Sequence, residues 1–211
     1  MKIAIKVCGV TDSANVGRIA ALKPDYFGVI LVESSPRFVS DIGVVKAIHS
    51  SCGESQLVAV VKDPDTKLLS VICSLKCFSA VQIHGIKYRE SAEYVKAHST
   101  SLQVWQVISV GKEATIDEVI DYKSADKVVF DGESPGSGIP FNWRVLSQQN
   151  ISIPFLIAGG IGPENSRAVV EMFKKHENFE GLDINSRVES SPGIKNSSLV
   201  ADVMVAVGRM V

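Results

Sequence analysis

Short apolar runs alternate with longer amphipathic segments along the whole chain, and the short runs predict eight β-strands. Most of these runs are rich in β-branched residues and almost continuously apolar, which is typical of strands buried on both faces. The predicted strands are Lys2–Val7, Tyr26–Leu31, Gln56–Val61, Ala80–His84, Leu102–Ile108, Lys127–Phe130, Pro154–Ala158 and Gly181–Ile184.

A segment with helical spacing of apolar residues follows each predicted strand. Asp41 or Ser40 is expected to cap the second helix, and Pro163 is expected to lie in the first turn of the seventh. The predicted helices are Ser13–Leu22, Ile42–His49, Pro64–Ser74, Tyr88–Ala97, Thr115–Tyr122, Trp143–Gln148, Pro163–Lys175 and Ser197–Met210.

Eight strand–helix units in succession predict parallel strands joined by right-handed crossovers. Eight such units close a (β/α)8 TIM barrel, although 211 residues is short for that fold. An open doubly wound sheet is the structural alternative, but it usually has fewer strands and often a G-x-G-x-x-G loop in its first turn. Here the first turn reads C-G-V-T-D-S, and no linker interrupts the chain. We therefore predict an α/β protein with a single (β/α)8 barrel domain over residues 1–211.

Composition and charge narrow the classes of function. The chain is 45% hydrophobic with a net charge of −1, and no basic stripe or acidic tail favours nucleic acid or a membrane surface as a partner. The first residues lack the pattern of a signal peptide, and no apolar run has transmembrane length, so we expect a cytoplasmic protein. Cys73 and Cys77 are one helical turn apart but lack a second ligand pair, and we predict no metal site.

Chemically reactive residues follow several of the predicted strands. Cys8 follows the first strand, Arg37 lies in S-S-P-R after the second, and Asp131 ends the sixth. In a barrel all these strand ends meet at one rim. A thiol can act as a base when a positive group lowers its pKa, and a buried carboxyl can act as an acid. The residues alone leave open that Cys8 fills the core, that Asp131 caps a turn and that Arg37 is a solvated surface arginine.

The ends of the seventh and eighth strands indicate a phosphate site. Gly159 and Gly160 expose backbone N–H groups, and Asn185 and Ser186 supply further donors where a short helix is expected to begin. Barrels often bind phosphate at these two strand ends. A tight turn is the alternative explanation for the paired glycines.

Six motifs, in order along the chain, resemble phosphoribosylanthranilate isomerases of tryptophan biosynthesis. They span residues 6–195 and read K-V-C-G-V-T-D, S-S-P-R-F-V-S, V-Q-I-H-G, F-D-G-E-S-P-G-S-G-I-P-F-N-W, I-A-G-G-I-G-P-E-N and D-I-N-S-R-V-E-S-S-P-G-I-K. The resemblance implies a (β/α)8 barrel that performs an Amadori rearrangement of N-(5'-phosphoribosyl)anthranilate without a cofactor. It also implies a small phosphorylated substrate as partner, and a monomer or homodimer.

The resemblance also implies roles for individual residues. Cys8 maps to the general base of the family, Asp131 to the general acid, and Arg37 to the arginine that faces the anthranilate carboxylate. The phosphate maps to Gly159, Gly160, Asn185 and Ser186, the last two at the start of N-S-R-V-E.

Some positions depart from the pattern of the family, and two other functions compete. Pro135 stiffens the loop after Asp131, and Arg187 replaces a glycine beside the phosphate, where it either adds a cation or points outward. His84 is expected to be a hydrogen-bonded rim histidine rather than an acid or base. The competing functions are an indole-glycerol-phosphate synthase, which would want a lysine low in the barrel, and a barrel that binds a phosphorylated ligand without turnover.

Overall fold

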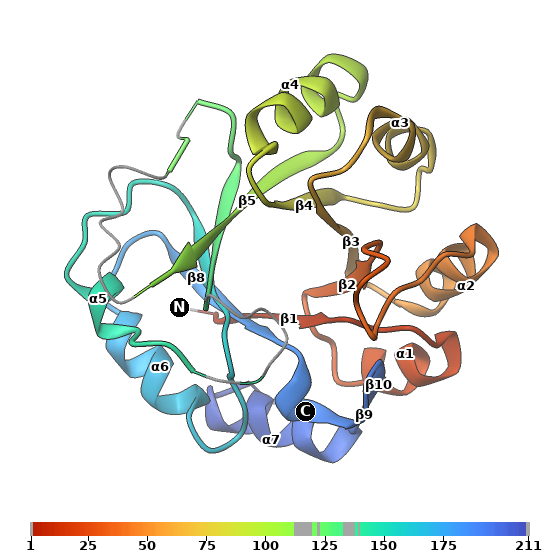
Figure 1. The fold of residues 1–211 in the computed structure, drawn as a ribbon. Helices are drawn as coiled ribbons and strands as arrows, with labels where there is room; N and C mark the ends of the chain where they lie inside the picture. The colour runs from red at the N-terminus through yellow and green to blue at the C-terminus, as the bar shows by residue number, and fades with distance from the viewer. Residues whose placement is uncertain (1, 112–119, 122, 133–137, 139, 210–211) are drawn as a thin grey trace.

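The strands form a closed barrel in the order β1 to β8, as the computed structural model shows for residues 2–111, 120–121, 123–132, 138 and 140–209 (Figure 1). Consecutive strands pair in parallel, and β8 pairs with β1 to close the ring. This confirms the predicted (β/α)8 barrel over the open doubly wound sheet. The strands are β1 Ala4–Cys8, β2 Tyr26–Ile30, β3 Gln56–Lys62, β4 Ala80–His84, β5 Gln103–Val110, β6 Lys127–Gly132, β7 Phe155–Ile157 and β8 Phe179–Ile184.

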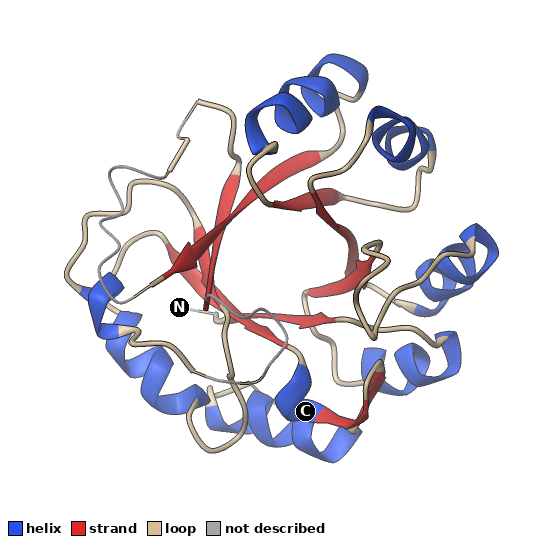
Figure 2. Cartoon of the chain, viewed as in Figure 1, coloured by secondary structure: helices blue, strands red, loops and turns tan. Residues whose placement is uncertain are grey.

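Helices surround the barrel on its outer face (Figure 2). They are α1 Ser13–Ala20, α2 Ile42–Ser51, α3 Thr66–Ser74, α4 Tyr88–His98, α5 Arg144–Ser147, α6 Ser166–Phe173 and α7 Ser197–Ala206. Asp41 accepts a hydrogen bond from the Gly43 N–H and is the cap of α2, one of the two residues expected there. The predicted helix Thr115–Tyr122 falls almost wholly outside the described residues. Within the described part of the chain, no helix combines the length and apolar character needed to cross a membrane.

Several boundaries differ from the prediction. Strand β1 extends through Cys8 and β6 extends through Gly132, so Cys8 is the last residue of β1 and Asp131 is the last but one of β6. The turn before α6 contains Pro163, and α6 begins only at Ser166. The hairpin formed by β9 Glu189–Ser191 and β10 Ile194–Lys195 was not predicted, and the 3-10 turn η2 Ser186–Val188 is the short helix expected near the phosphate residues.

Strand alternation decides which side chains face the inside of the barrel. Val58 and Trp105 belong to a small buried cluster inside the ring. Two residues beyond Val58 along β3, Val60 lines an open cavity, and so do Asp131 on β6 and Cys8 on β1. Because side chains two apart in a strand share a face, the apolar cluster lies below the cavity and supports it.

Candidate active site

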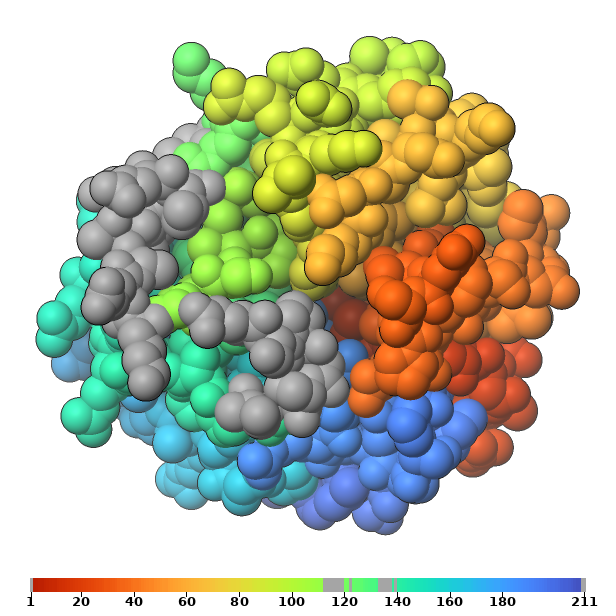
Figure 3. All heavy atoms as spheres, viewed as in Figure 1, coloured from red at the N-terminus to blue at the C-terminus, as the bar shows by residue number. Residues whose placement is uncertain are grey.

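A cavity of about 670 Å³ lies at the carboxyl ends of the strands. Figure 3 views this face of the molecule and shows a recess near its centre, with red atoms of the N-terminal segment visible inside. The structure brings every residue of the predicted site to the wall of this one cavity, and the roles of these residues remain predictions. The seven residues are Cys8, Arg37, Asp131, Gly159, Gly160, Asn185 and Ser186.

Cys8 shares the inner face of β1 with Lys6, because the two residues are two apart in the strand. Gly28 on the neighbouring strand β2 leaves the space that both side chains use. A Cβ atom at Gly28 would lie 2.7 Å from Cys8 Sγ and 3.1 Å from Lys6 Nζ. Burial raises the pKa of the Cys8 thiol, and the Lys6 ammonium opposes this rise.

Lys6 and Asp183 form a buried ion pair beside the thiol. They are register partners on β1 and β8, and Lys6 Nζ lies 2.8 Å from Asp183 Oδ2. Their side chains are 0% and 6% exposed, so solvent hardly screens the two charges. Burial acts to lower the pKa of Lys6, but the Asp183 carboxylate and the Cys8 thiol outweigh it and raise that pKa. The ammonium is therefore a permanent positive charge next to Cys8.

Asp131 faces the cavity from β6. Burial, helped by the negative charge of Asp183, raises the pKa of Asp131 to about 6, while the N–H of Gly132 and the charge of Lys6 act in the opposite direction. The Gly132 N–H donates to Asp131 Oδ1 at 2.8 Å and fixes the carboxyl. A carboxyl in this state can hold a proton near neutral pH and give it to a bound molecule.

Gln82 and His84 line the cavity from β4. Gln82 Nε2 lies 3.1 Å from His84 Nε2, so the histidine is hydrogen-bonded at the rim, as expected. Burial and the nearby charges of Lys6 and Lys62 lower the pKa of His84 to about 4. His84 is therefore neutral at physiological pH, and its ring nitrogen accepts the Gln82 N–H.

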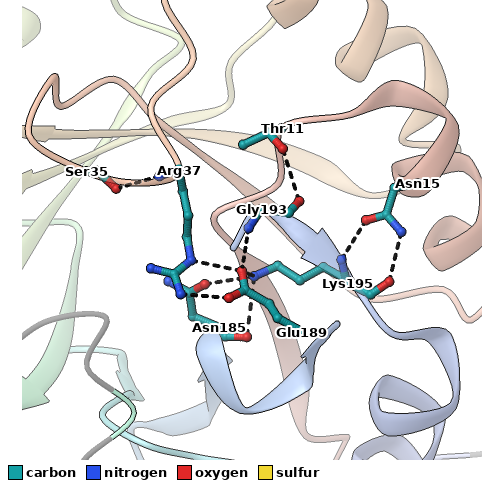
Figure 4. Close-up of polar contacts among 8 residues, drawn as sticks. All are labelled: Thr11, Asn15, Ser35, Arg37, Asn185, Glu189, Gly193 and Lys195. Carbon is teal, nitrogen blue, oxygen red and sulfur yellow. Dashed lines mark hydrogen bonds and ion pairs between the residues drawn. The ribbon is translucent and has the colours of Figure 1, made fainter. Parts of the chain in front are cut away.

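Arg37 is held by a buried carboxylate (Figure 4). Arg37 Nε and Nη2 donate to the two carboxylate oxygens of Glu189 at 2.8 and 2.6 Å. Glu189 Oε1 also accepts from Lys195 Nζ at 2.6 Å and from the Gly193 N–H at 3.0 Å. Burial would raise the pKa of Glu189, but the hydrogen bonds from Arg37 and Lys195 outweigh it and lower that pKa. Arg37 therefore meets a protein carboxylate on one edge of its guanidinium group.

The predicted phosphate residues line the cavity from the ends of β7 and β8, and Asn185 also lies beside Arg37, because a Cβ atom at Gly9 would contact both side chains. Gly159 and Gly160 have φ values of 79° and 66°, which only glycine adopts without strain. A Cβ atom at Gly159 would also lie 3.2 Å from Asp131 Oδ1, so the turn passes close to the acid. Lys195 Nζ donates to Asn185 Oδ1 at 2.7 Å, and this contact fixes the orientation of the Asn185 amide.

Arg187 is held by two contacts near the rim of the cavity. Its Nε donates to the Gly138 carbonyl at 3.0 Å, and its Nη1 pairs with Glu164. Arg187 is not among the described residues that line the cavity, although Gly138 is, and its role toward the phosphate stays a prediction. It connects the loop after β6 to the segment before α6.

Four charged residues around the cavity were missed by the sequence analysis: Lys6, Asp183, Glu189 and Lys195. The signal for Lys6 and Asp183 was present, because each is a charged residue in an apolar strand at an inward-facing position. Glu189 and Lys195 flank a turn that reads S-S-P-G-I, and nothing local to that turn indicates that the two side chains meet.

Comparisons with known proteins match one family over nearly the whole chain. A family model described as N-(5'-phosphoribosyl)anthranilate (PRA) isomerase matches residues 5–206. The N-(5'-phosphoribosyl)anthranilate isomerase of Rhizobium etli (strain CIAT 652) is 32% identical over 215 residues, covering 98% of this chain and 95% of the relative.

Solved structures of the same fold agree with this result. The phosphoribosyl anthranilate isomerase of Thermus thermophilus superimposes with a TM-score of 0.83 at 24% identity, covering 97% of this chain and 98% of that one. A second isomerase structure, described as a complex with reduced 1-(o-carboxyphenylamino)-1-deoxyribulose 5-phosphate, has a TM-score of 0.82 at 18% identity and covers 98% of both chains.

Proposed function

The chain belongs to the N-(5'-phosphoribosyl)anthranilate isomerase family, and from this premise we propose that Cys8 is its general base and Asp131 its general acid. Membership places the chain among the isomerases of tryptophan biosynthesis. The proposed reaction converts N-(5'-phosphoribosyl)anthranilate to 1-(2-carboxyphenylamino)-1-deoxyribulose 5-phosphate. A solved protein of the same fold is described as a complex with the reduced form of that product, which supports the choice of ligand.

The first step is the opening of the ribose ring. Protonated Asp131 gives its proton to the ring oxygen, the bond from that oxygen to C1 breaks, and the lone pair of the anthranilate nitrogen forms a C1=N iminium. With a pKa of about 6, the carboxyl is protonated in about one molecule in ten at pH 7. An ordinary aspartate would carry that proton in about one molecule in a thousand.

The second step removes the proton at C2. Cys8 as thiolate takes this proton, the C–H electrons form a C1=C2 double bond, and the iminium nitrogen becomes neutral. The C2 hydroxyl of the enolamine then loses its proton while C1 gains one, and the double bond moves from C1=C2 to C2=O to give the ketone. Lys6 is the group that supports the thiolate, because its ammonium lowers the pKa that burial raises. The iminium adds a second positive charge near the sulfur just before Cys8 removes the C2 proton, and this charge favours the thiolate.

The two charged ends of the substrate define its orientation. We place the phosphate against the backbone of Gly159 and Gly160 and the side chains of Asn185 and Ser186, which line the cavity at the ends of β7 and β8. We place the anthranilate carboxylate at Arg37, which lines the cavity as well. The sugar then lies between Cys8 and Asp131.

One observation carries this proposal: a thiol with an adjacent ammonium and a carboxyl with a raised pKa line the same cavity. The raised pKa of Asp131 is what an acid needs, and the ammonium of Lys6 limits the rise that burial imposes on the pKa of the base, Cys8. A core cysteine or a turn-capping aspartate would need neither.

The experiment follows the loss of anthranilate-adduct fluorescence with purified wild type, Cys8→Ala and Asp131→Asn. We expect each substitution to lower kcat by about 10²–10⁴-fold, the contribution typical of a general acid or base. Cys52→Ala and Asp202→Asn are matched controls, since Cys52 is a second buried thiol and Asp202 is a carboxylate on α7, and neither is among the described residues that line the cavity.

The outcomes separate the competing functions. The proposal is supported if wild type and both control variants consume the fluorescent adduct, and neither Cys8→Ala nor Asp131→Asn does. With 1-(2-carboxyphenylamino)-1-deoxyribulose 5-phosphate as the substrate instead, formation of an indole product with release of carbon dioxide would identify a synthase. Binding of the adduct without turnover in wild type would identify a non-catalytic barrel, and a Cys8→Ala or Asp131→Asn variant with most of its kcat would remove that residue from the mechanism.

A further inference from the structure

The edge of Arg37 that faces Glu189 is already occupied before any substrate binds. A guanidinium group has five N–H donors arranged along two edges that can each meet a carboxylate. Glu189 takes the side-on edge formed by Nε and Nη2. The end-on edge, formed by Nη1 and the second Nη2 hydrogen, makes no hydrogen bond to any described residue, and Arg37 lines the cavity.

Glu189 is itself fixed from several directions, as Figure 4 shows. It opens the β9–β10 hairpin, and Lys195 from the far end of the same hairpin donates to it at 2.6 Å. The backbone of Lys195 is tied to α1, since Asn15 exchanges two hydrogen bonds of 2.8 Å with its N–H and its carbonyl. The carboxylate therefore has little freedom to follow Arg37 if the arginine moves.

The chain also makes room for Arg37 in this orientation. Gly9 has a φ of 74°, and a Cβ atom there would lie 2.6 Å from Arg37 Cδ and 2.7 Å from Asn185 Oδ1. The Ser35 hydroxyl accepts a hydrogen bond from the Arg37 N–H and orders the loop after β2. The side chains of Arg37 and Glu189 are only 8% and 5% exposed.

We propose that Glu189 is a positioning residue for substrate specificity: it clamps the side-on edge of Arg37 so that the end-on edge points at the ortho carboxylate of the anthranilate ring. This inference rests on the proposed function. A flexible arginine would lose side-chain entropy when it bound the carboxylate, and a clamped arginine has already lost it. The substrate class selected is an N-aryl ribosylamine phosphate whose aryl ring carries a carboxylate ortho to the nitrogen.

The test compares two substrates made from ribose 5-phosphate, one with anthranilate and one with aniline, which lacks the carboxylate. The measured quantity is the ratio of kcat/KM for the two substrates. We expect wild type to favour the anthranilate adduct by about 100-fold or more, and Glu189→Gln to reduce that ratio by about ten-fold or more. Glu189 also contacts Lys195, which holds Asn185, but an effect on the phosphate is common to both adducts and cancels in the ratio, so the ratio reports Arg37.

Two further variants separate positioning from a general structural role. Arg37→Ala should remove the preference, and Arg37→Ala/Glu189→Gln should show the same ratio as Arg37→Ala alone, since we propose that Glu189 changes this ratio only through the arginine. Glu189→Asp keeps the charge but withdraws it by one methylene, and we expect an intermediate ratio. Glu189→Asp also replaces Glu189→Gln as the test variant if circular dichroism shows that Glu189→Gln does not fold.

Each result decides one question. If wild type does not convert the anthranilate adduct, the proposed function fails, and the inference falls with it. If wild type converts and discriminates, but Glu189→Gln or Glu189→Asp discriminates equally well, Glu189 does not position Arg37. The same conclusion follows if the double variant loses preference beyond Arg37→Ala, because Glu189 would then act by another route.

Discussion

Replacing Lys6 by methionine tests whether the buried ion pair both stabilises the barrel and supports the thiolate. Methionine keeps an unbranched apolar stem of similar length but removes the ammonium. Asp183 then loses a partner at 2.8 Å in a place where both side chains are almost fully buried. Removing one member of a buried pair typically costs about 3–5 kcal/mol. For a chain of this size that corresponds to a fall of about 6–20 °C in the thermal midpoint.

The cost should depend on pH in a defined direction. Burial already raises the pKa of Asp183 in the presence of Lys6, and the loss of the ammonium raises it further. The folded Lys6→Met variant then binds a proton more readily than its unfolded chain, whose carboxyl titrates near 3.9. Its stability therefore falls as the pH rises between those two pKa values. We expect the deficit against wild type to be small near pH 4.5 and largest above pH 7 in thermal unfolding followed by circular dichroism.

A double variant separates stability from catalysis. Lys6→Met/Asp183→Leu removes both charges, and we expect it to regain most of the lost thermal midpoint, since a packed apolar pair is about as stable as a buried ion pair. It should not regain reactivity of Cys8. The measurement is the rate of iodoacetamide alkylation against pH in a background whose other three cysteines are alanine. Both variants should show an alkylation midpoint at higher pH than wild type, because the ammonium that opposes burial is gone.

Three results would refute this reasoning. A deficit that does not change between pH 4.5 and pH 8 would show that Asp183 is not the source of the cost. A double variant as unstable as Lys6→Met would show that packing, rather than an unpaired charge, dominates. An alkylation midpoint equal to that of wild type would show that Lys6 does not support the Cys8 thiolate.

Two further predictions concern the acid and the backbone. The logarithm of kcat/KM should rise with pH up to about 6 and level off above it. Below the pKa of Asp131 the acid is already protonated, so each unit by which the pH falls lowers only the fraction of thiolate. A rise that levels off near pH 4 would contradict the raised pKa. Gly181→Ala should prevent folding, because its Cβ atom would lie 1.9 Å from the Ala4 carbonyl oxygen, whereas Gly17→Ala, with nothing within 4 Å, should stabilise α1 by about 0.5–1 kcal/mol in urea unfolding.

The order of strands and helices could be predicted from the sequence because barrel strands are buried on both faces. Such strands appear as nearly continuous apolar runs, as in residues 57–61 of β3, which are followed by the helix α3 with its buried Leu69 and Ile72. Exact ends were less predictable. The polar residues Cys8 and Asp131 looked like the first residues of loops, but backbone pairing with β2 and β5 continues through them.

The predicted site residues could be found because each stands at a strand end, which the barrel topology places at one mouth. The charges that act on them could not be found in the same way. Lys6 and Asp183 are 177 residues apart, and Arg37 and Glu189 are 152 apart. Whether two such charges meet depends on strand register and on the hairpin after η2, and neither can be derived from local sequence.

The location of these charges links the closure of the barrel to the proposed chemistry. Lys6 lies on the first strand and Asp183 on the last, and the two are direct partners across the seam where β1 meets β8. Glu189 and Lys195 follow β8 and reach back to Arg37 after β2 and to Asn15 on α1. Before β8 pairs with β1, Lys6 has no Asp183 to hold it beside the thiol, and Arg37 has no Glu189 to orient it. The site that we propose is thus complete only when β8 is paired with β1, so its electrostatics depend on the long-range pairing that closes the barrel.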